Sequence, residues 1–174
     1  MLHFQKQDSH YILRDFYCGV AKMDMFISDG LEYILQEPKY HFYIVRDDND
    51  VIVAMFVFSE GKVIRGKDEY IEIVDDGTPH AIFEGGCVID RICYETLEID
   101  YLAVQEEYRN NGIGTTIISE LSKLAKQQGK HFLTVDAFHE DGYSAIPFYE
   151  KNQFIAVEDF KAEQDTQRMF LFVG

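Results

Sequence analysis

A chain of 174 residues with 47% hydrophobic side chains is long enough to bury its own core and too short for two ordinary domains, so we expect a single domain over residues 1–174. The formal net charge of −15 disfavours nucleic acid as a partner, because nonspecific affinity for phosphate backbones comes mainly from Lys and Arg. The first residues lack the layout of a secretory signal, no apolar run is long enough to cross a bilayer, and the cysteines form no C-x-x-C pair. These features predict a cytoplasmic protein that makes no membrane contact.

The first half of the chain predicts a helix followed by an antiparallel hairpin. Apolar residues recur at helical spacing over residues 22–36, and Pro38 follows them. Residues 40–46 and 51–59 are rich in β-branched and aromatic side chains, and the acidic run between them has the composition of a turn. The stretch at residues 60–94 is the least regular. It predicts a small hairpin or an elaborate loop, which is a candidate wall for an acceptor pocket.

The second half predicts a strand, a helix and a strand, and then a helix and two more strands. These elements are expected at residues 97–104, 112–127, 132–138, 143–151, 154–157 and 168–173. A strand, a helix and a second strand in this order imply a right-handed crossover between parallel neighbours. The fold class expected is therefore α/β, with a mixed, mostly antiparallel central sheet flanked by helices and one parallel pair of strands.

The loop before the 112–127 helix has the composition of an anion site. It reads Arg109-Asn110-Asn111-Gly112-Ile113-Gly114-Thr115. Two glycines at a helix start expose backbone N–H groups at the positive end of the helix dipole, although a tight turn alone would also explain them. A P-loop would need Lys after the second glycine, and a dinucleotide fold would need a third glycine near Ile117. The sequence lacks both of these features.

Two motifs resemble those of the GCN5-related N-acetyltransferases (GNAT). The string from Arg109 to Gly114 resembles the family signature Arg/Gln-x-x-Gly-x-Gly/Ala, and as in the family it follows a strand that ends in Leu102-Ala103-Val104. The second motif is an aromatic pair on the last helix, here Phe148-Tyr149, followed by a short connection to Phe154. The resemblance is specific over about residues 97–154. Ser144 and Gln153 depart from the family pattern, which often has Asn and usually has Gly at these positions. Neither position performs chemistry, so the departures bear on the local turn and not on the activity.

The resemblance implies where acetyl-CoA binds. The parallel strands would splay to admit it as co-substrate, and the edge formed by Leu102, Ala103 and Val104 would pair with its pantetheine arm. The backbone amides that would hold its diphosphate belong to Arg109, Asn110, Asn111, Gly112, Ile113, Gly114 and Thr115. Lys123, Lys126 and Lys130 form either a basic patch near the adenosine end or a solvated helix face.

The resemblance also implies catalytic roles. Tyr149 would act as the general acid for the departing thiolate, and the backbone N–H of Leu102 would donate to the carbonyl oxygen. Glu98 stands where some members of the family carry a catalytic glutamate, and Asp100 points to the same side of the strand. A water relay replaces a dedicated base in many members, so Glu98, Asp100 and water all remain candidates. The histidines lack the spacing of metal ligands, so we expect no metal.

The activity implied is transfer of an acetyl group from acetyl-CoA to a primary amine of a small molecule or a protein. Two alternatives remain. Toxin-type acetyltransferases that act on aminoacyl-tRNA are resembled by three strings, Phe16-Tyr17-Cys18-Gly19, Met23-Asp24-Met25-Phe26 and Arg168-Met169-Phe170-Leu171. An acyl-CoA-binding regulatory module would keep the loop without turnover. A homodimer is a further expectation, since dimers are the commonest soluble oligomers.

Overall fold

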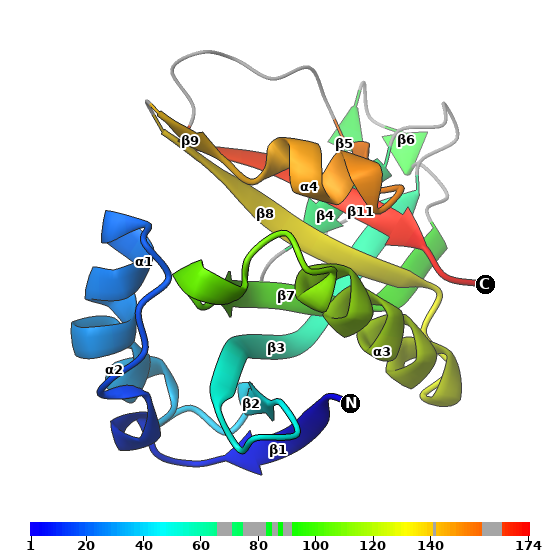
Figure 1. The fold of residues 1–174 in the computed structure, drawn as a ribbon. Helices are drawn as coiled ribbons and strands as arrows, with labels where there is room; N and C mark the ends of the chain where they lie inside the picture. The colour runs from blue at the N-terminus through cyan, green and yellow to red at the C-terminus, as the bar shows by residue number, and fades with distance from the viewer. Residues whose placement is uncertain (66–70, 75–82, 85–86, 89–91, 141, 158–164) are drawn as a thin grey trace. The chain divides into compact units, whose positions relative to one another are not determined.

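The computed structural model describes residues 1–65, 71–74, 83–84, 87–88, 92–140, 142–157 and 165–174 (Figure 1). Two compact units make up the chain: Met1–Ser59 with Ile99–Ser119, and Glu60–Glu98 with Glu120–Gly174. Strands β3 (Ile52–Arg65) and β7 (Ile92–Val104) each contribute residues to both units. In the described part of the chain, no helix is both long and apolar enough to span a membrane.

The sheet of the first unit begins with strands from far apart in the sequence. β1 (His3–Gln7) pairs antiparallel with β2 (His41–Arg46), and β2 pairs antiparallel with β3. The amide of Gln105 donates to the carbonyl of Val53 at 2.9 Å, so the end of β7 lies beside β3. The predicted antiparallel hairpin is confirmed, whereas β1 lies outside the elements that the sequence predicts.

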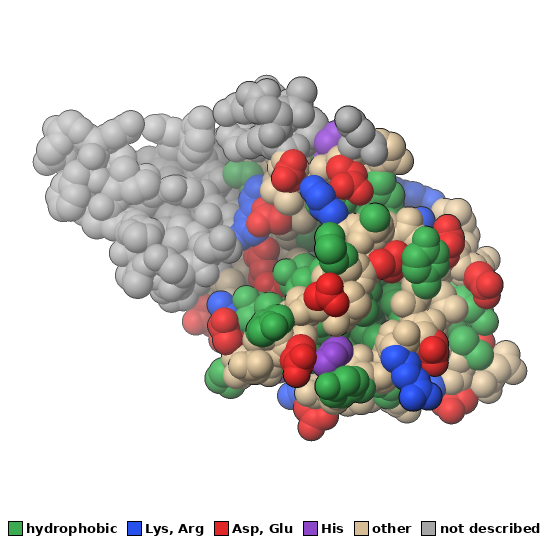
Figure 2. Space-filling model, turned by 90° about the vertical axis from the view of Figure 1, so that its left-hand side faces the viewer, with side chains coloured by type: hydrophobic (Ala, Val, Ile, Leu, Met, Phe, Trp, Pro, Cys, Tyr) green, Lys and Arg blue, Asp and Glu red, His purple; other side chains and the backbone are tan. Residues whose placement is uncertain are grey.

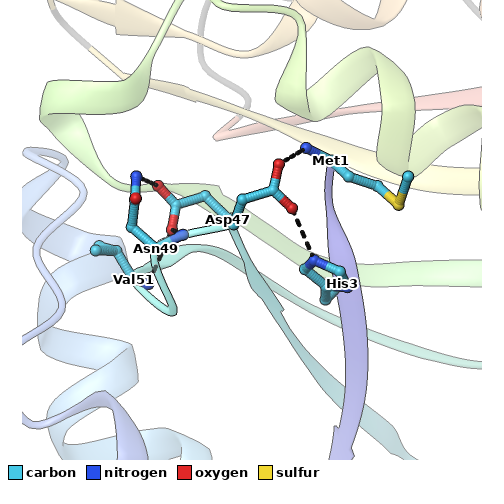
Figure 3. Close-up of polar contacts among 6 residues, drawn as sticks. Met1, His3, Asp47, Asn49 and Val51 are labelled. Atoms are coloured by element: carbon cyan, nitrogen blue, oxygen red, sulfur yellow. Dashed lines mark hydrogen bonds and ion pairs between the residues drawn. The ribbon is translucent and has the colours of Figure 1, made fainter.

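The turn between β2 and β3 is held by the carboxylate of Asp47 (Figure 3). Its Oδ1 accepts hydrogen bonds from the backbone amides of Asn49 and Val51, both at 2.9 Å. The amide of Val51, followed by that of Asn49, lowers the pKa of Asp47 below its ordinary value. The neighbouring Asp48 contacts the ring of His3 at 3.0 Å. The acidic run is therefore a turn in which a carboxylate satisfies backbone donors.

The predicted helix at residues 22–36 forms one continuous helical segment with an irregular middle. Its parts are α1 (Ala21–Met25), the π-helical turn η2 (Phe26–Gly30) and α2 (Leu31–Ile34). The ring of Phe26 stacks on Tyr101 with centroids 3.7 Å apart, and its edge lies 2.7 Å from where a Cβ on Gly30 would stand. Gly30 thus makes room for that ring. Figure 2, which views the side where α1 and α2 lie, shows acidic side chains spread among hydrophobic ones.

The second unit contains the parallel pair of strands. The ring of Tyr94 on β7 packs against Phe132 on β8 (Phe132–Glu140), and two residues further along each strand the hydroxyls of Thr96 and Thr134 lie 3.4 Å apart. The two strands therefore advance in the same direction, as the sequence predicts. The predicted splay of this pair remains a prediction.

The remaining strands of the second unit are antiparallel. β8 pairs with β11 (Thr166–Phe172), which pairs with β10 (Ile155–Ala156), and β4 (Ile71–Val74) pairs with β3. β5 (Phe83–Glu84) and β6 (Cys87–Val88) form a separate pair. The stretch at residues 60–94 thus includes short hairpins, and the rest of it lies outside the described residues.

The two main helices of the second half differ in how closely the sequence predicts them. Helix α3 (Ile113–Gln127) agrees with the prediction, and its apolar stripe is buried at Ile117, Leu121 and Ala125. The prediction that the next helix starts at residue 143 is wrong, because Tyr143–Ser144 form strand β9, which pairs with β8. Helix α4 (Ile146–Lys151) begins after it and contacts β8 (Figure 1).

Candidate functional site

The glycine loop in the first unit presents backbone amides at the start of α3. The carbonyl of Gly112 accepts from the amide of Thr116 at 3.0 Å, so the amides between them precede the first recorded bond of the helix. Gly112 is exposed, has a φ of 76°, and a Cβ built on it would meet nothing within 4 Å. Asn110 also takes a left-handed φ of 61°. These backbone conformations leave an open turn at the start of a helix, a kind of site that suits an anion.

Arg109 anchors the glycine loop through hydrogen bonds to other parts of the first unit. Its guanidinium donates to the carbonyl of Cys18, and its backbone amide donates to the carbonyl of Glu106 at 3.3 Å within the 3₁₀ turn η3 (Glu106–Tyr108). The side-chain amide of Asn111 donates to the carbonyl of Tyr108 at 3.2 Å. The Arg109 amide is thus already engaged, so the amides after it are the better candidates for a bound diphosphate.

The segment that Arg109 contacts is itself organised by Asp24 on α1. Its carboxylate accepts from the backbone amides of Cys18 at 2.8 Å and Gly19 at 3.0 Å. Gly19 has a φ of 77°, and a Cβ there would lie 2.7 Å from the carboxylate of Glu106. Burial raises the pKa of the Cys18 thiol to about 11, so this cysteine is a buried thiol and a poor nucleophile. The segment at residues 16–19 therefore holds the glycine loop in place through the hydrogen bond between Cys18 and Arg109.

Tyr149 is buried in the second unit among aromatic rings. Its ring meets Phe148 and Phe154 edge to face, with centroids 5.0 Å and 5.2 Å away. Burial, and then the charges of Tyr143 and Glu98, raise the pKa of Tyr149 well above its ordinary value. The phenol therefore keeps its proton at neutral pH, as a general acid must before it donates.

The two departures from the family pattern are accommodated beside Tyr149. The hydroxyl of Ser144 accepts from the amide of Ile146, the first residue of α4, at 3.3 Å. Gln153 adopts a left-handed φ of 69°, the conformation that favours glycine at this position. Gln153 therefore bears the strain of a side chain at positive φ.

Glu98 is buried and already holds two hydrogen-bond donors. Its Oε1 lies 2.6 Å from Nη1 of Arg168, and its Oε2 accepts from the hydroxyl of Thr134. The same Arg168 nitrogen lies 3.0 Å from Oδ2 of Asp136. A carboxylate held in this way is stabilised as an anion and has little freedom to take a proton. This geometry argues against Glu98 as the base.

The predicted site residues fall into two groups. Glu98 and Tyr149 lie in the second unit. Residues 102–104 and 109–115 lie in the first unit. The roles predicted for the Leu102 amide and for the strand edge remain predictions.

Two of the three lysines, Lys123 and Lys130, have different surroundings. Lys123 pairs with Glu120 at 2.6 Å on the exposed face of α3, whereas Lys130 is buried and lies 3.2 Å from Glu60. These contacts leave less free positive charge than a basic patch would require, and they favour the solvated face for Lys123. Among the described residues, no group of three or more His, Cys, Asp or Glu side chains could hold a metal ion.

Sequence reasoning assigned no site role to Asp24, Thr134, Asp136 or Arg168, although Asp24 and Arg168 lie in the strings that resemble toxin-type acetyltransferases. A weak signal existed for two of them, because Thr134 and Asp136 are alternating polar residues in an apolar strand. Asp24 binds amides only a few residues before it, whereas Arg168 carries no local signal, because its partner Glu98 lies far away in the sequence.

A sequence model of the acetyltransferase (GNAT) family matches residues 9–154. The chain belongs to this family. The GNAT match covers the bracing segment, the glycine loop and Tyr149, and it supports acyl-CoA-dependent acetyl transfer as the general chemistry. No curated protein matches the chain.

Solved structures with a similar fold include several toxins. A bacterial toxin aligns at 14% identity with a TM-score of 0.69, covering 99% of this chain and 91% of that one. AtaT complexed with acetyl-methionyl-tRNAfMet aligns at 17% identity with a TM-score of 0.64, covering 99% and 95%. A KacTA-DNA complex aligns at 16% identity with a TM-score of 0.64, covering 99% and 94%. At these identities, the likeness shows the GNAT fold alone.

Proposed function

We propose that this GNAT protein transfers an acetyl group from acetyl-CoA to a primary amine of a small molecule or a protein. The observation that carries the proposal is the open turn at Gly112, where a Cβ would meet no protein atom within 4 Å and the amides that follow precede the first recorded bond of α3. A diphosphate carries the negative charge that such amides bind. The residues proposed to hold it run from Asn110 to Thr115, with Arg109 bracing them, and Leu102, Ala103 and Val104 would pair with the pantetheine arm.

The phenol of Tyr149 is the group that we propose as the general acid of this reaction. Attack of the amine on the thioester carbonyl forms the new C–N bond, and the C–S bond then breaks to release a thiolate that needs a proton. The phenol of Tyr149 carries a proton at neutral pH, and the family motif places it to give this proton to that thiolate; its raised pKa keeps the proton in place and does not itself favour donation. The amine loses its own proton to water or to a base, and proton transfer through water restores the phenol. The engagement of Glu98 by Arg168 and Thr134 favours the water relay.

The test is release of free thiol from acetyl-CoA in the presence of polyamines, amino acids, aminoglycosides and peptides. We expect release with at least one class of amine, and a Tyr149→Phe variant that is slower by about 100-fold, the scale of general acid catalysis. Tyr33→Phe is a matched control, because Tyr33 is 70% exposed. Acetyl-CoA binding without thiol release, unaffected by Tyr149→Phe, would instead support the regulatory module.

A second candidate acceptor is the amine of an aminoacyl-tRNA. The structure of AtaT complexed with acetyl-methionyl-tRNAfMet, which aligns over 99% of this chain, favours it. The net charge of −15 opposes it, because an RNA-binding surface needs Lys and Arg. Methionyl-tRNA added to the same assay decides between the acceptors. Acetylation of this tRNA, together with growth arrest on expression that Tyr149→Phe relieves, would make it the substrate.

A further inference from the structure

The carboxylate of Asp24 holds two consecutive peptide groups of the segment before α1. Its Oδ1 accepts from the amide of Cys18 at 2.8 Å, and its Oδ2 accepts from the amide of Gly19 at 3.0 Å. Hydrogen bonds from amides to a charged carboxylate are stronger than those to a neutral acceptor. One side chain in the first turn of α1 therefore fixes the orientation of both peptide planes.

The carbonyl ends of the same two peptide groups bind the chain that leads into the glycine loop. The first peptide ends in the carbonyl of Tyr17, which accepts from the backbone amide of Glu106 at 3.0 Å. The second peptide ends in the carbonyl of Cys18, which accepts from the guanidinium of Arg109. Each peptide group is therefore bound at its N–H by Asp24 and at its carbonyl by a residue of the loop. All of these residues belong to the first unit.

The Asp24 carboxylate and the Arg109 guanidinium bind opposite ends of the same peptide group. Hydrogen bonds in a chain polarise one another, so an anion at the N–H makes the carbonyl a better acceptor, and a cation at the carbonyl makes the N–H a better donor. The two charges therefore support each other through the peptide. Loss of the charge on Asp24 would weaken the bond that Arg109 makes to the carbonyl of Cys18.

The glycine loop needs support because its backbone conformation is uncommon. Asn110 and Gly112 take left-handed φ values of 61° and 76°, which are unusual for a residue with a side chain and only one of many choices for glycine. The supporting segment approaches closely, since a Cβ on Gly19 would stand 2.7 Å from the carboxylate of Glu106. A loop already in its binding conformation binds its ligand more tightly, because less order must be imposed on binding. The hold of Asp24 on the loop is therefore expected to appear as ligand affinity.

We propose that Asp24 is a positioning residue for acetyl-CoA, which holds the glycine loop in its diphosphate-binding conformation through the two peptide groups and Arg109. Loss of Asp24 weakens the binding of the diphosphate and leaves the chemical step unchanged. This inference rests on the proposed function, in which the amides from Asn110 to Thr115 hold the diphosphate.

The first experiment measures the Kd of coenzyme A by calorimetry and needs no acetyl acceptor. Asp24→Asn keeps the shape of the side chain and removes its charge, and we expect it to raise the Kd by about 10-fold, within the usual range of coupling between sites. Asp24→Glu keeps the charge and should recover part of the affinity. Asp29→Asn is the matched control and should keep the wild-type Kd, because Asp29 is exposed on the same helical segment. An unchanged Kd in Asp24→Asn would overturn the inference.

A double variant tests the route through the peptide group. If Asp24 acts through Arg109, Asp24→Asn should raise the Kd of coenzyme A less in an Arg109→Met background than in the wild type. Losses of affinity that simply add would show that the two residues act independently and would refute the route.

The second experiment follows the loop in the protein without ligand. The amide of Glu106 donates to the carbonyl of Tyr17, so we expect Asp24→Asn to speed its hydrogen exchange by about 10-fold while the amides of β2 exchange as in the wild type. Unchanged exchange at Glu106 would overturn the inference. A wild type that binds no coenzyme A would refute the proposed function itself, and hydrogen exchange would still decide whether Asp24 holds the loop.

The third experiment separates positioning of the loop from a general loss of structure. With the best acceptor of the amine panel, Asp24→Asn should raise the KM of acetyl-CoA by the same factor as the Kd of coenzyme A without lowering kcat. Acetylpantetheine lacks the diphosphate, so its kcat/KM should be the same in Asp24→Asn and in the wild type. Equal losses with acetyl-CoA and acetylpantetheine would mean that Asp24 acts on the fold as a whole, which would refute the inference while the proposed function would stand.

Discussion

The guanidinium of Arg109 donates a hydrogen bond to the backbone carbonyl of Cys18, which joins the glycine loop to the segment before α1. The family resemblance places this arginine at a diphosphate, where its charge would contact the ligand. The structure gives it a contact within the protein. A role in binding phosphate and a role in holding the loop predict different effects of an Arg109 substitution on the Tm of the ligand-free protein.

Arg109→Met should lower the Tm of the ligand-free protein. A charged donor to a backbone carbonyl is worth about 1 to 3 kcal/mol, and its loss also frees the loop that Gly112 belongs to. The stabilisation by acetyl-CoA should shrink as a consequence. Thermal unfolding with and without acetyl-CoA checks this, and an unchanged Tm without ligand, combined with a lost ligand shift, would show that Arg109 is only a phosphate ligand.

Gly112→Val should abolish the rise in Tm that acetyl-CoA produces by linkage. A side chain at a φ of 76° is strained by about 1 to 2 kcal/mol, and its Cβ would project into the space proposed for phosphate oxygens. Gly129→Val is a matched control, because Gly129 has a φ of 71° and equally open surroundings at the other end of α3. Both variants should lose stability, and only the Gly112 variant should lose the ligand shift. An equal rise in Tm on addition of acetyl-CoA to the two variants would mean that the diphosphate binds elsewhere.

Tyr149 should make stability fall at alkaline pH. Its folded-state pKa lies above the ordinary value of 10.0, so the unfolded chain gives up this proton first and the folded state binds more protons above that pH. The contribution of Tyr149 is therefore complete below about pH 10 and is lost as the pH rises from there toward the folded-state pKa. The Tm of Tyr149→Phe should decline less steeply than that of the wild type above about pH 10. Parallel declines would contradict the burial of this phenol.

Asp47 should stabilise the β2–β3 turn in a pH-dependent way. The amides of Val51 and Asn49 hold its folded-state pKa below the ordinary value of 3.8, so its contribution is present above that pH and is lost as the pH falls through the folded-state pKa. Asp47→Asn should lower the Tm at neutral pH, and the difference from the wild type should vanish in acid. A difference that persists in acid would mean that the carboxylate charge is not what holds the turn.

The sequence by itself determined the elements that depend on neighbouring residues. The apolar stripe of α3, the turn chemistry around Asp47 and the glycine at position 112 are local patterns, and each has the structure that its spacing predicts. The family motif at Arg109 to Gly114 is equally local. Short-range hydrogen bonds and the spacing of the buried residues are sufficient to specify these elements.

Only the tertiary structure decided which side chains meet. Arg168 reaches Glu98 across 70 positions of the chain, and Arg109 reaches Cys18 across 91. Neither pairing has a period or a spacing that could be read in advance, because β-strand register and crossover order bring these residues together. The same long-range packing buries Glu98 and Tyr149. It brings Arg168 and Thr134 to the Glu98 carboxylate, and burial raises the pKa of the Tyr149 phenol.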